Sequence, residues 1–172
     1  TLYALGELAR YHRARFDLPA VAVTGSNGKT TTKEMIAAIF AEGGKTLKSE
    51  GNLNNLIGLP HQVLRLTGRH TRAVFEMGMN RPGEIRRLAE IAMPEVALIT
   101  NVAPAHLEGL GSIEAVRDAK GELLEVMGAE GRAALSAMPY SRKCASAMIR
   151  ADRLSSVCTF RIHECFRKRR AS

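Results

Sequence analysis

The sequence predicts an α/β protein in which helices flank a mostly parallel sheet with a phosphate-binding loop at the end of one strand. Two observations predict this fold class. Short apolar runs alternate with segments of helical spacing along residues 1–135, and a glycine-bearing turn ending in Lys-Thr follows the first apolar run. The 45% hydrophobic content of the 172 residues is enough for a sizeable core. We expect the sheet to be incomplete within this chain.

The phosphate-binding loop is predicted from the segment VAVTGSNGKTTTK, residues 21–33. An apolar strand reaches a turn whose two glycines allow backbone N–H groups to approach a polyphosphate, and the next helix points its positive end there. Lys29 is the candidate for the β- and γ-phosphates, and the Thr30 hydroxyl is the candidate for magnesium. Val23 replaces the first glycine of the strict motif, so an ordinary strand–turn–helix with an Asn-Gly turn stays open. The predicted nucleotide-binding residues are Gly25, Ser26, Asn27, Gly28, Lys29, Thr30 and Thr31.

Helices are predicted on both sides of the first strand, which covers residues 20–24. Leucines recur at helical spacing over residues 2–12 and predict a connecting helix. The second helix ends at Gly43-Gly44. Its predicted apolar face consists of Met35, Ile36, Ile39 and Phe40.

An asparagine-rich loop, GNLNNLIGLP over residues 51–60, follows a predicted short strand at residues 45–48. Pro60 is suited to open the next helix. Asn52, Asn54 and Asn55 can hydrogen-bond a polar ligand, or they can satisfy the backbone of their own turn-rich connection. Both interpretations stay open.

Two further strands are predicted at residues 73–77 and 96–100, and each is followed or ended by polar groups. These groups are expected to face the same crevice as the phosphate loop. Ligands bind beyond the carboxyl ends of the strands in an open parallel sheet, so Glu76 is expected to face Lys29. Glu76 is either a metal ligand or a solvated, capping carboxylate. His106, after the later strand, is either a contact for magnesium or phosphate or a structural histidine.

The last predicted helix is capped by Ser112 and carries a lysine, Lys120, within its apolar stripe. A desolvated lysine has a lowered pKa, so this position suits covalent modification or contact with an anion. The alternative is a lysine whose stem reaches along the helix to water. A strand over residues 133–135 follows.

The positive charge of the chain is concentrated at its end. Residues 1–135 hold 16 basic and 15 acidic residues, whereas residues 136–172 hold 9 and 2, so the net charge of +8 is a property of the tail. A basic run without interleaved aromatic residues is typical of a solvated segment, and nucleic-acid binding is not expected. All three cysteines lie in this tail without a metal-binding or disulfide pattern.

No apolar run approaches the roughly 18 residues that a membrane span requires, and no signal peptide is visible. We therefore expect a cytoplasmic protein. The chain opens on Thr1 rather than Met, which predicts that preceding residues are missing.

Residues 1–135 resemble the central ATP-binding domain of the Mur ligases, which build the peptide stem of the peptidoglycan precursor. The segment TGSNGKTT at residues 24–31 is similar to the shortened phosphate loop of that family. The blocks at residues 51–60 and 76–85 resemble the members that add D-alanyl-D-alanine. The resemblance implies the end of an N-terminal domain at 1–19, a partial central domain at 20–135 and a divergent, disorder-prone tail at 136–172.

The resemblance also implies roles for individual residues. Lys29 and the loop amides would bind ATP, and Thr30 with Glu76 would hold one magnesium ion. His106 would serve a second magnesium ion, which a carbamylated Lys120 would help to place, so that Lys29, His106 and Lys120 are the candidate catalytic residues. Asn52, Asn54 and Asn55 would lie near the substrate.

The implied reaction joins D-Ala-D-Ala to UDP-N-acetylmuramoyl-tripeptide through an acyl phosphate made at the expense of ATP. A monomer is expected. The tail departs from the family at residues 136–140, and other domains of the family are missing, so we expect this chain alone to be inactive. The alternatives are a non-catalytic nucleotide-binding remnant and a ligase of the folylpolyglutamate synthase type.

Overall fold

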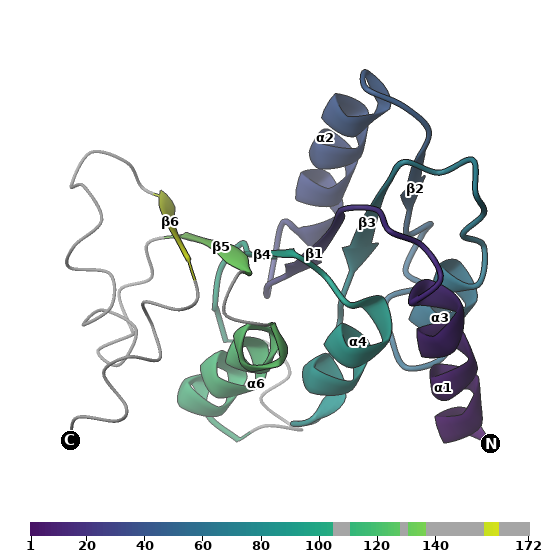
Figure 1. Ribbon diagram of the computed structural model, residues 1–172. Helices are drawn as coiled ribbons and strands as arrows, with labels where there is room; N and C mark the ends of the chain where they lie inside the picture. Colours follow the sequence, from purple (N-terminus) through teal and green to yellow (C-terminus); the bar gives the residue numbers. More distant parts are fainter. Residues whose placement is uncertain (105–110, 128–130, 137–156, 162–172) are drawn as a thin grey trace.

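A six-stranded sheet forms the centre of the computed structural model, which describes residues 1–104, 111–127, 131–136 and 157–161 (Figure 1). The strands are β1 (Ala20–Thr24), β2 (Thr46–Lys48), β3 (Arg72–Glu76), β4 (Val96–Ile99), β5 (Arg132–Ser136) and β6 (Val157–Arg161). Their order is β2-β3-β1-β4-β5-β6. Neighbouring strands from β2 to β5 are parallel, and β6 pairs with β5 in the antiparallel direction.

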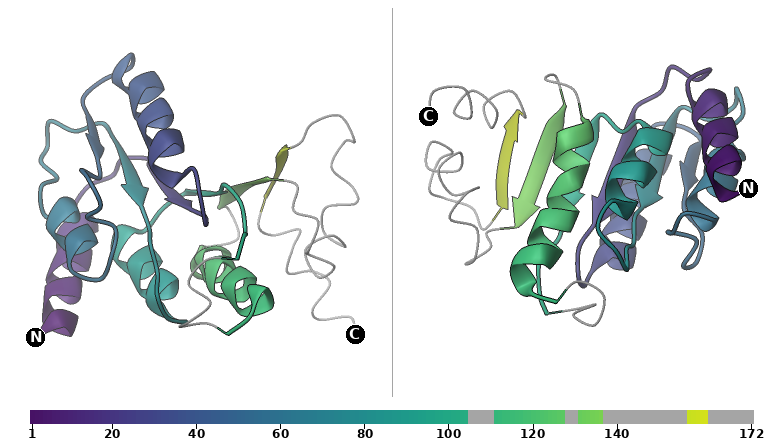
Figure 2. Two further views of the ribbon diagram at one scale, coloured as in Figure 1. Left: turned by 180° about the vertical axis from the view of Figure 1, so that it is seen from behind. Right: turned by 90° about the horizontal axis from the view of Figure 1, so that it is seen from below.

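Helices cover both faces of the sheet. They are α1 (Leu2–Arg13), α2 (Lys29–Ala41), α3 (Gly58–Val63), α4 (Glu84–Ala92) and α6 (Ile113–Val126). Helix α2 lies on one face, and α1, α4 and α6 lie side by side on the other (Figure 2). No helix in the described ranges is long and apolar enough to cross a membrane.

The central strand β1 is buried on both sides. All five of its residues are buried, because Ala20 and Ala22 face the layer of α1, α4 and α6, whereas Val21 and Val23 face α2. A strand alternates its side chains between the two faces, and a parallel strand covered on both faces is therefore apolar throughout. The predicted parallel α/β sheet is confirmed.

The predicted elements match the observed ones closely. The predicted strands at residues 20–24, 73–77 and 96–100 differ from β1, β3 and β4 by at most one residue at either end. Helix α3 begins at Gly58, two residues before Pro60, so the predicted start is slightly late. Ser112 caps α6 as expected, since its Oγ accepts the Ala115 N–H at 3.2 Å.

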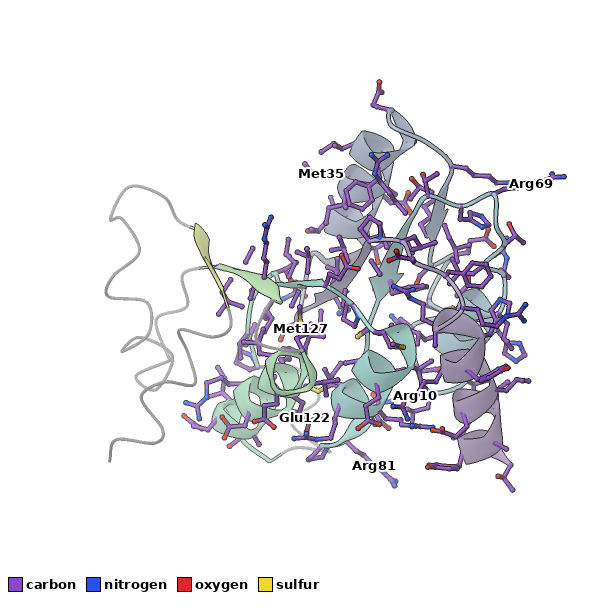
Figure 3. The ribbon with its side chains drawn as sticks, viewed as in Figure 1. Arg10, Met35, Arg69, Arg81, Glu122 and Met127 are labelled. Atoms are coloured by element: carbon purple, nitrogen blue, oxygen red, sulfur yellow. The ribbon has the colours of Figure 1, made fainter. Side chains whose placement is uncertain are left out.

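The predicted apolar face of α2 is wrong for two of its four residues. Met35 and Ile39 are 63% and 69% exposed, and Met35 projects away from the sheet (Figure 3). Lys33 and Ala37 are buried instead, with Ile36 and Phe40 packed against the sheet. The helix is turned in this way because the Lys33 ammonium forms a buried ion pair, described below, that hydrophobic spacing does not reveal.

Strand β6 lies in the tail that composition separates at residue 136, and it is not predicted from the sequence. It pairs with the whole of β5, from Arg132 opposite Arg161 to Ser136 opposite Val157. Part of the tail therefore belongs to the sheet. The domain boundaries at 19 and 135 stay predictions.

Candidate functional site

Three strand ends bring the candidate site together. Strand β1 lies between β3 and β4, with Val23 opposite Glu76 and Thr24 opposite Ile99. The turn that begins at Gly25, the carboxylate of Glu76 and the polar residues after β4 therefore share one edge of the sheet. This is the edge at which an open parallel sheet binds ligands.

The turn after β1 has the conformation of an anion-binding loop. Gly28 caps α2 in the left-handed conformation, with φ of 78°, which glycine adopts without steric cost. The Lys29 ammonium folds back over the loop and donates to the carbonyl oxygens of Gly25, at 2.7 Å, and Ser26, at 3.4 Å. Backbone donors, a helix N-terminus and one cation thus converge on a small volume.

The end of β4 holds this loop in place. Asn101 accepts the Ser26 N–H with its carbonyl oxygen at 3.1 Å and the Asn27 N–H with Oδ1 at 2.8 Å. Thr100 Oγ1 donates to the Asn27 carbonyl at 2.6 Å. A Cβ added at Gly25 would lie 1.9 Å from that hydroxyl oxygen, so only glycine fits there.

Glu76 is buried at the end of β3 and has polar partners on both carboxylate oxygens. Its side chain is 3% exposed. Thr30 Oγ1 donates to Oε2 at 3.0 Å, and Asn54 Nδ2 donates to Oε1 at 2.9 Å. The backbone N–H of Glu76 donates to Ser49 Oγ at 3.1 Å. This carboxylate is therefore neither solvated nor a helix cap. Its role as a metal ligand stays a prediction.

The buried Lys33 balances the charge of Glu76. Its side chain is 1% exposed, and its Nζ lies 3.6 Å from Glu76 Oε2 and 3.2 Å from Glu34 Oε1. A charged lysine is buried at acceptable cost only beside such partners. The sequence offers one signal for this residue, a lysine one turn beyond Lys29 on the same helix.

The three asparagines of the 51–60 loop have different roles. Asn54 binds Glu76, as described, whereas Asn55 Oδ1 accepts the N–H groups of Ile57 and Gly58 and so satisfies its own loop. Asn52 is exposed. Asn55 thus satisfies the backbone of its own connection, whereas ligand binding by the loop stays a prediction.

An open cavity of about 500 Å³ adjoins Lys29 and the asparagine-rich loop. All three asparagines line it together with Gly78, Met79 and Asn80 of the loop that follows β3. The Gly78 N–H donates to the Asn54 carbonyl at 2.8 Å, which ties the two walls together. The cavity is large enough for part of a polar ligand extending from the phosphate loop.

Lys120 lies on α6 and is buried as well, with 2% of its surface exposed. This burial argues against a stem that reaches bulk water. Burial, together with the positive charge of Lys29, lowers the pKa of Lys120 to about 8. The amine is thus available in its neutral form more readily than that of an ordinary lysine.

The structure accordingly brings Lys29, Thr30 and Glu76 together, with Asn54 beside them. Thr31 is exposed in the first turn of α2. His106 lies outside the described residues. Three supporting residues were not predicted as members of the site, and each has a partner there that is distant in the chain: Lys33, Ser49 and Thr100.

Thr30 and Glu76 offer oxygen donors of the kind that magnesium prefers. No group of three or more His, Cys, Asp or Glu side chains within the described ranges could hold a metal ion by itself. Magnesium at nucleotide sites is typically held by one or two protein oxygens together with phosphate oxygens. The donor set therefore fits a magnesium ion that arrives with a nucleotide.

The chain is similar in sequence to curated ligases over most of its length. The model of the Mur ligase middle domain matches residues 23–168. UDP-N-acetylmuramoyl-tripeptide--D-alanyl-D-alanine ligase of Escherichia coli is 47% identical over 137 residues, and the enzyme of the same name from Bacillus subtilis is 43% identical over 131. These alignments cover 80% and 76% of the chain but 30% and 29% of the relatives, so the chain spans about a third of their length or less.

Solved structures agree with the sequence matches. A crystal structure of MurF from Acinetobacter baumannii superimposes with a TM-score of 0.81 and 38% identity, over 85% of this chain and 33% of that one. MurF ligase from Thermotoga maritima, solved in complex with ADP, gives a TM-score of 0.70 and 38% identity, over 74% and 30%. With the family model covering most of its residues, the chain belongs to the Mur ligase middle-domain family.

Proposed function

We propose that this chain is the ATP-binding part of a ligase that joins D-Ala-D-Ala to UDP-N-acetylmuramoyl-tripeptide in peptidoglycan precursor synthesis. The observation that supports this most is the convergence of Lys29, Thr30 and Glu76 at the ends of the adjacent strands β1 and β3, in a chain 47% identical to the E. coli ligase of that name. The complex of the Thermotoga relative with ADP supports nucleotide binding. Such a ligase acts in the cytoplasm.

The reaction has two steps. The terminal carboxylate of the tripeptide attacks the γ-phosphorus of ATP, which forms an acyl phosphate and releases ADP. The amine of D-Ala-D-Ala then attacks the acyl carbon, the C–O bond to phosphate breaks, and phosphate leaves while the amine loses a proton. Transfer of this kind depends on positioning and on neutralising the phosphoryl oxygens.

The residues of this chain divide these tasks. Lys29 and the N–H groups of residues 28–31, at the start of α2, would hold the phosphates, for which the Lys29 ammonium would leave the Gly25 carbonyl. Thr30 and Glu76 would hold magnesium, which would supply positive charge to the phosphoryl oxygens. The cavity beside Lys29 would receive the tripeptide end, with Asn52 and the neighbouring asparagines as polar contacts.

Lys120 would act as a carbamate rather than as an ammonium. The ammonium would first lose a proton, and the neutral amine would then add to carbon dioxide and release a second proton, so that a positive side chain becomes a negative one. A pKa of about 8 supports this step, since it leaves roughly a tenth of the amine neutral at pH 7. The carbamate would help to place a second magnesium ion with His106.

Calorimetric titration of the chain with ATP and magnesium tests this proposal. We expect binding that Lys29→Ala weakens about 10- to 100-fold, the scale of a charge-assisted hydrogen bond. Lys45→Ala is the matched control, because Lys45 is exposed and lies outside the site. Equal affinities in the parent, Lys29→Ala and Lys45→Ala would contradict the assignment of the phosphate site.

A further inference from the structure

Glu122 lies on α6, two residues beyond Lys120, and forms hydrogen bonds to the backbone of a different helix. We propose that Glu122 is a positioning residue, whose carboxylate locks α6 onto the start of α4 and thereby holds Lys120 in the site. The bonds made by Glu122, the loop that they anchor and the geometry of α6 support this role.

Both carboxylate oxygens of Glu122 bind the N-terminal turn of α4. The Gly83 N–H donates to Oε1 at 2.7 Å, and the Arg86 N–H donates to Oε2 at 3.1 Å. These donors lack partners within their own helix, and Gly83, the capping residue, has no side chain to supply one. Glu122 therefore caps α4 from outside, and it lies between α6 and the beginning of α4 (Figure 3).

The capped turn is continuous with the wall of the cavity. The loop from Gly78 to Asn80 leads from Glu76 into α4, and Glu84 accepts the N–H groups of Asn80, at 2.6 Å, and Arg81, at 3.2 Å. Glu84 thus fixes the loop to the helix from one side, and Glu122 fixes the helix to α6 from the other. A single hydrogen-bonded connection runs from the cavity wall to the helix that carries Lys120.

The geometry of α6 explains why Lys120 needs such a restraint. The helix packs through Val116, Ala119 and Leu123, and these apolar contacts have little directional preference. Burial of the Lys120 ammonium is unfavourable and tends to rotate the helix toward water. Each residue advances a helix by about 100°, so fixing Glu122 against α4 fixes the direction of Lys120.

The test measures how well the folded chain protects the Lys120 amine from a labelling reagent. Reductive methylation with formaldehyde and a borane, followed by peptide mass spectrometry, gives a labelling rate for each lysine. We expect Glu122→Ala to raise the rate at Lys120 about fivefold, the scale set by the loss of one helix cap. Glu122→Gln, which keeps one acceptor, should give a smaller rise.

Two controls separate positioning from stability. Glu125→Ala removes the partner of the Arg86 side chain, one turn further along α6, and should leave Lys120 protected. Lys33, which is 1% exposed on α2, is the internal reference within each sample. A role limited to capping α4 would speed hydrogen exchange at Gly83 and Arg86 while leaving the labelling of Lys120 unchanged.

The proposal is overturned if Lys120 is labelled at the parental rate in Glu122→Ala. It is also overturned if Lys33 and Lys120 rise together in both Glu122 variants, because Glu122 would then stabilise the domain as a whole. The inference rests on the proposed role of Lys120, but the labelling requires no nucleotide. The labelling result can therefore be interpreted even if the chain fails to bind ATP.

Discussion

Two buried lysines lie on helices that cover opposite faces of the sheet, and their electrostatic surroundings differ. Lys33 on α2 lies between the carboxylates of Glu76 and Glu34, so its charge is balanced within the chain. Lys120 on α6 is close enough to Lys29 for that cation to lower its pKa, so like charges meet there. On the β3 side of the site, the buried charges are therefore balanced without a ligand. On the Lys120 side, a bound anion or loss of the lysine charge would relieve the repulsion between Lys120 and Lys29.

The largest expected effect comes from breaking the balanced side. Glu76→Ala leaves the Lys33 ammonium buried without its innermost carboxylate, and breaking a buried ion pair from one side costs about 3–5 kcal/mol. Urea unfolding at pH 7 measures the loss. Glu34→Ala is the control, since Glu34 is the exposed partner of the same lysine, and a loss as large from Glu34→Ala would contradict the comparison.

The next largest effect is expected from removing the charge of Lys120. We expect Lys120→Met to raise the free energy of unfolding by about 2–3 kcal/mol at pH 7, because the protonated amine is buried at a cost. The unfolded chain binds more protons than the native one between the native pKa of about 8 and the ordinary value of 10.5. The stability of the parent should therefore rise with pH across this window.

Urea titrations at pH 7 and pH 10 check this prediction. The rise should be absent from Lys120→Met and unchanged in Lys45→Met, whose lysine is exposed. A pH-independent difference between the parent and Lys120→Met would refute the electrostatic origin of the cost.

A smaller effect is expected from removing a hydrogen bond to the carboxylate of Glu76. Asn54→Ala removes the amide that donates to Glu76 Oε1, and leaving one buried acceptor with fewer donors costs about 1–3 kcal/mol. Asn52→Ala, at an exposed asparagine of the same loop, should change the unfolding free energy by less than about 0.5 kcal/mol. Similar losses in the two variants would mean that Asn54 does not support Glu76.

The smallest effect concerns the start of the helix that carries Lys120. Ser112→Ala removes the hydroxyl that accepts the Ala115 N–H and should cost about 1 kcal/mol in thermal unfolding. Ser112→Asp keeps an acceptor at the same place and should retain most of the stability. The prediction fails if both variants lose equally.

Residues whose role depends on the end of a strand were predictable from the sequence. Glu76 and Lys29 follow from apolar runs, glycines and the rule that parallel strands share one ligand-binding edge. Lys33 was not predictable, because its burial depends on Glu76, which lies 43 positions later in the chain. For the same reason the outward turn of Met35 was missed.

Other parts of the site were hidden for different reasons. Thr100 and Asn101 look like the polar end of a strand, and their bonds to the phosphate loop appear only once β4 lies beside β1. Strand β6 was missed because its apolar run is short and lies among scattered basic residues. Its partner β5 ends about 20 residues earlier in the chain.

The position of β1 in the sheet also governs when the site can form during folding. Its partner strands β3 and β4 begin at Arg72 and Val96. Strand β1, which carries the phosphate loop, is therefore synthesised early but pairs with its neighbours late. Contacts so distant in the chain form slowly, because a long loop must close before they stabilise anything. On the ribosome, the loop emerges tens of residues before Asn101, which holds it in shape. Nascent chains therefore lack a correctly shaped phosphate loop until the middle of the sheet has assembled.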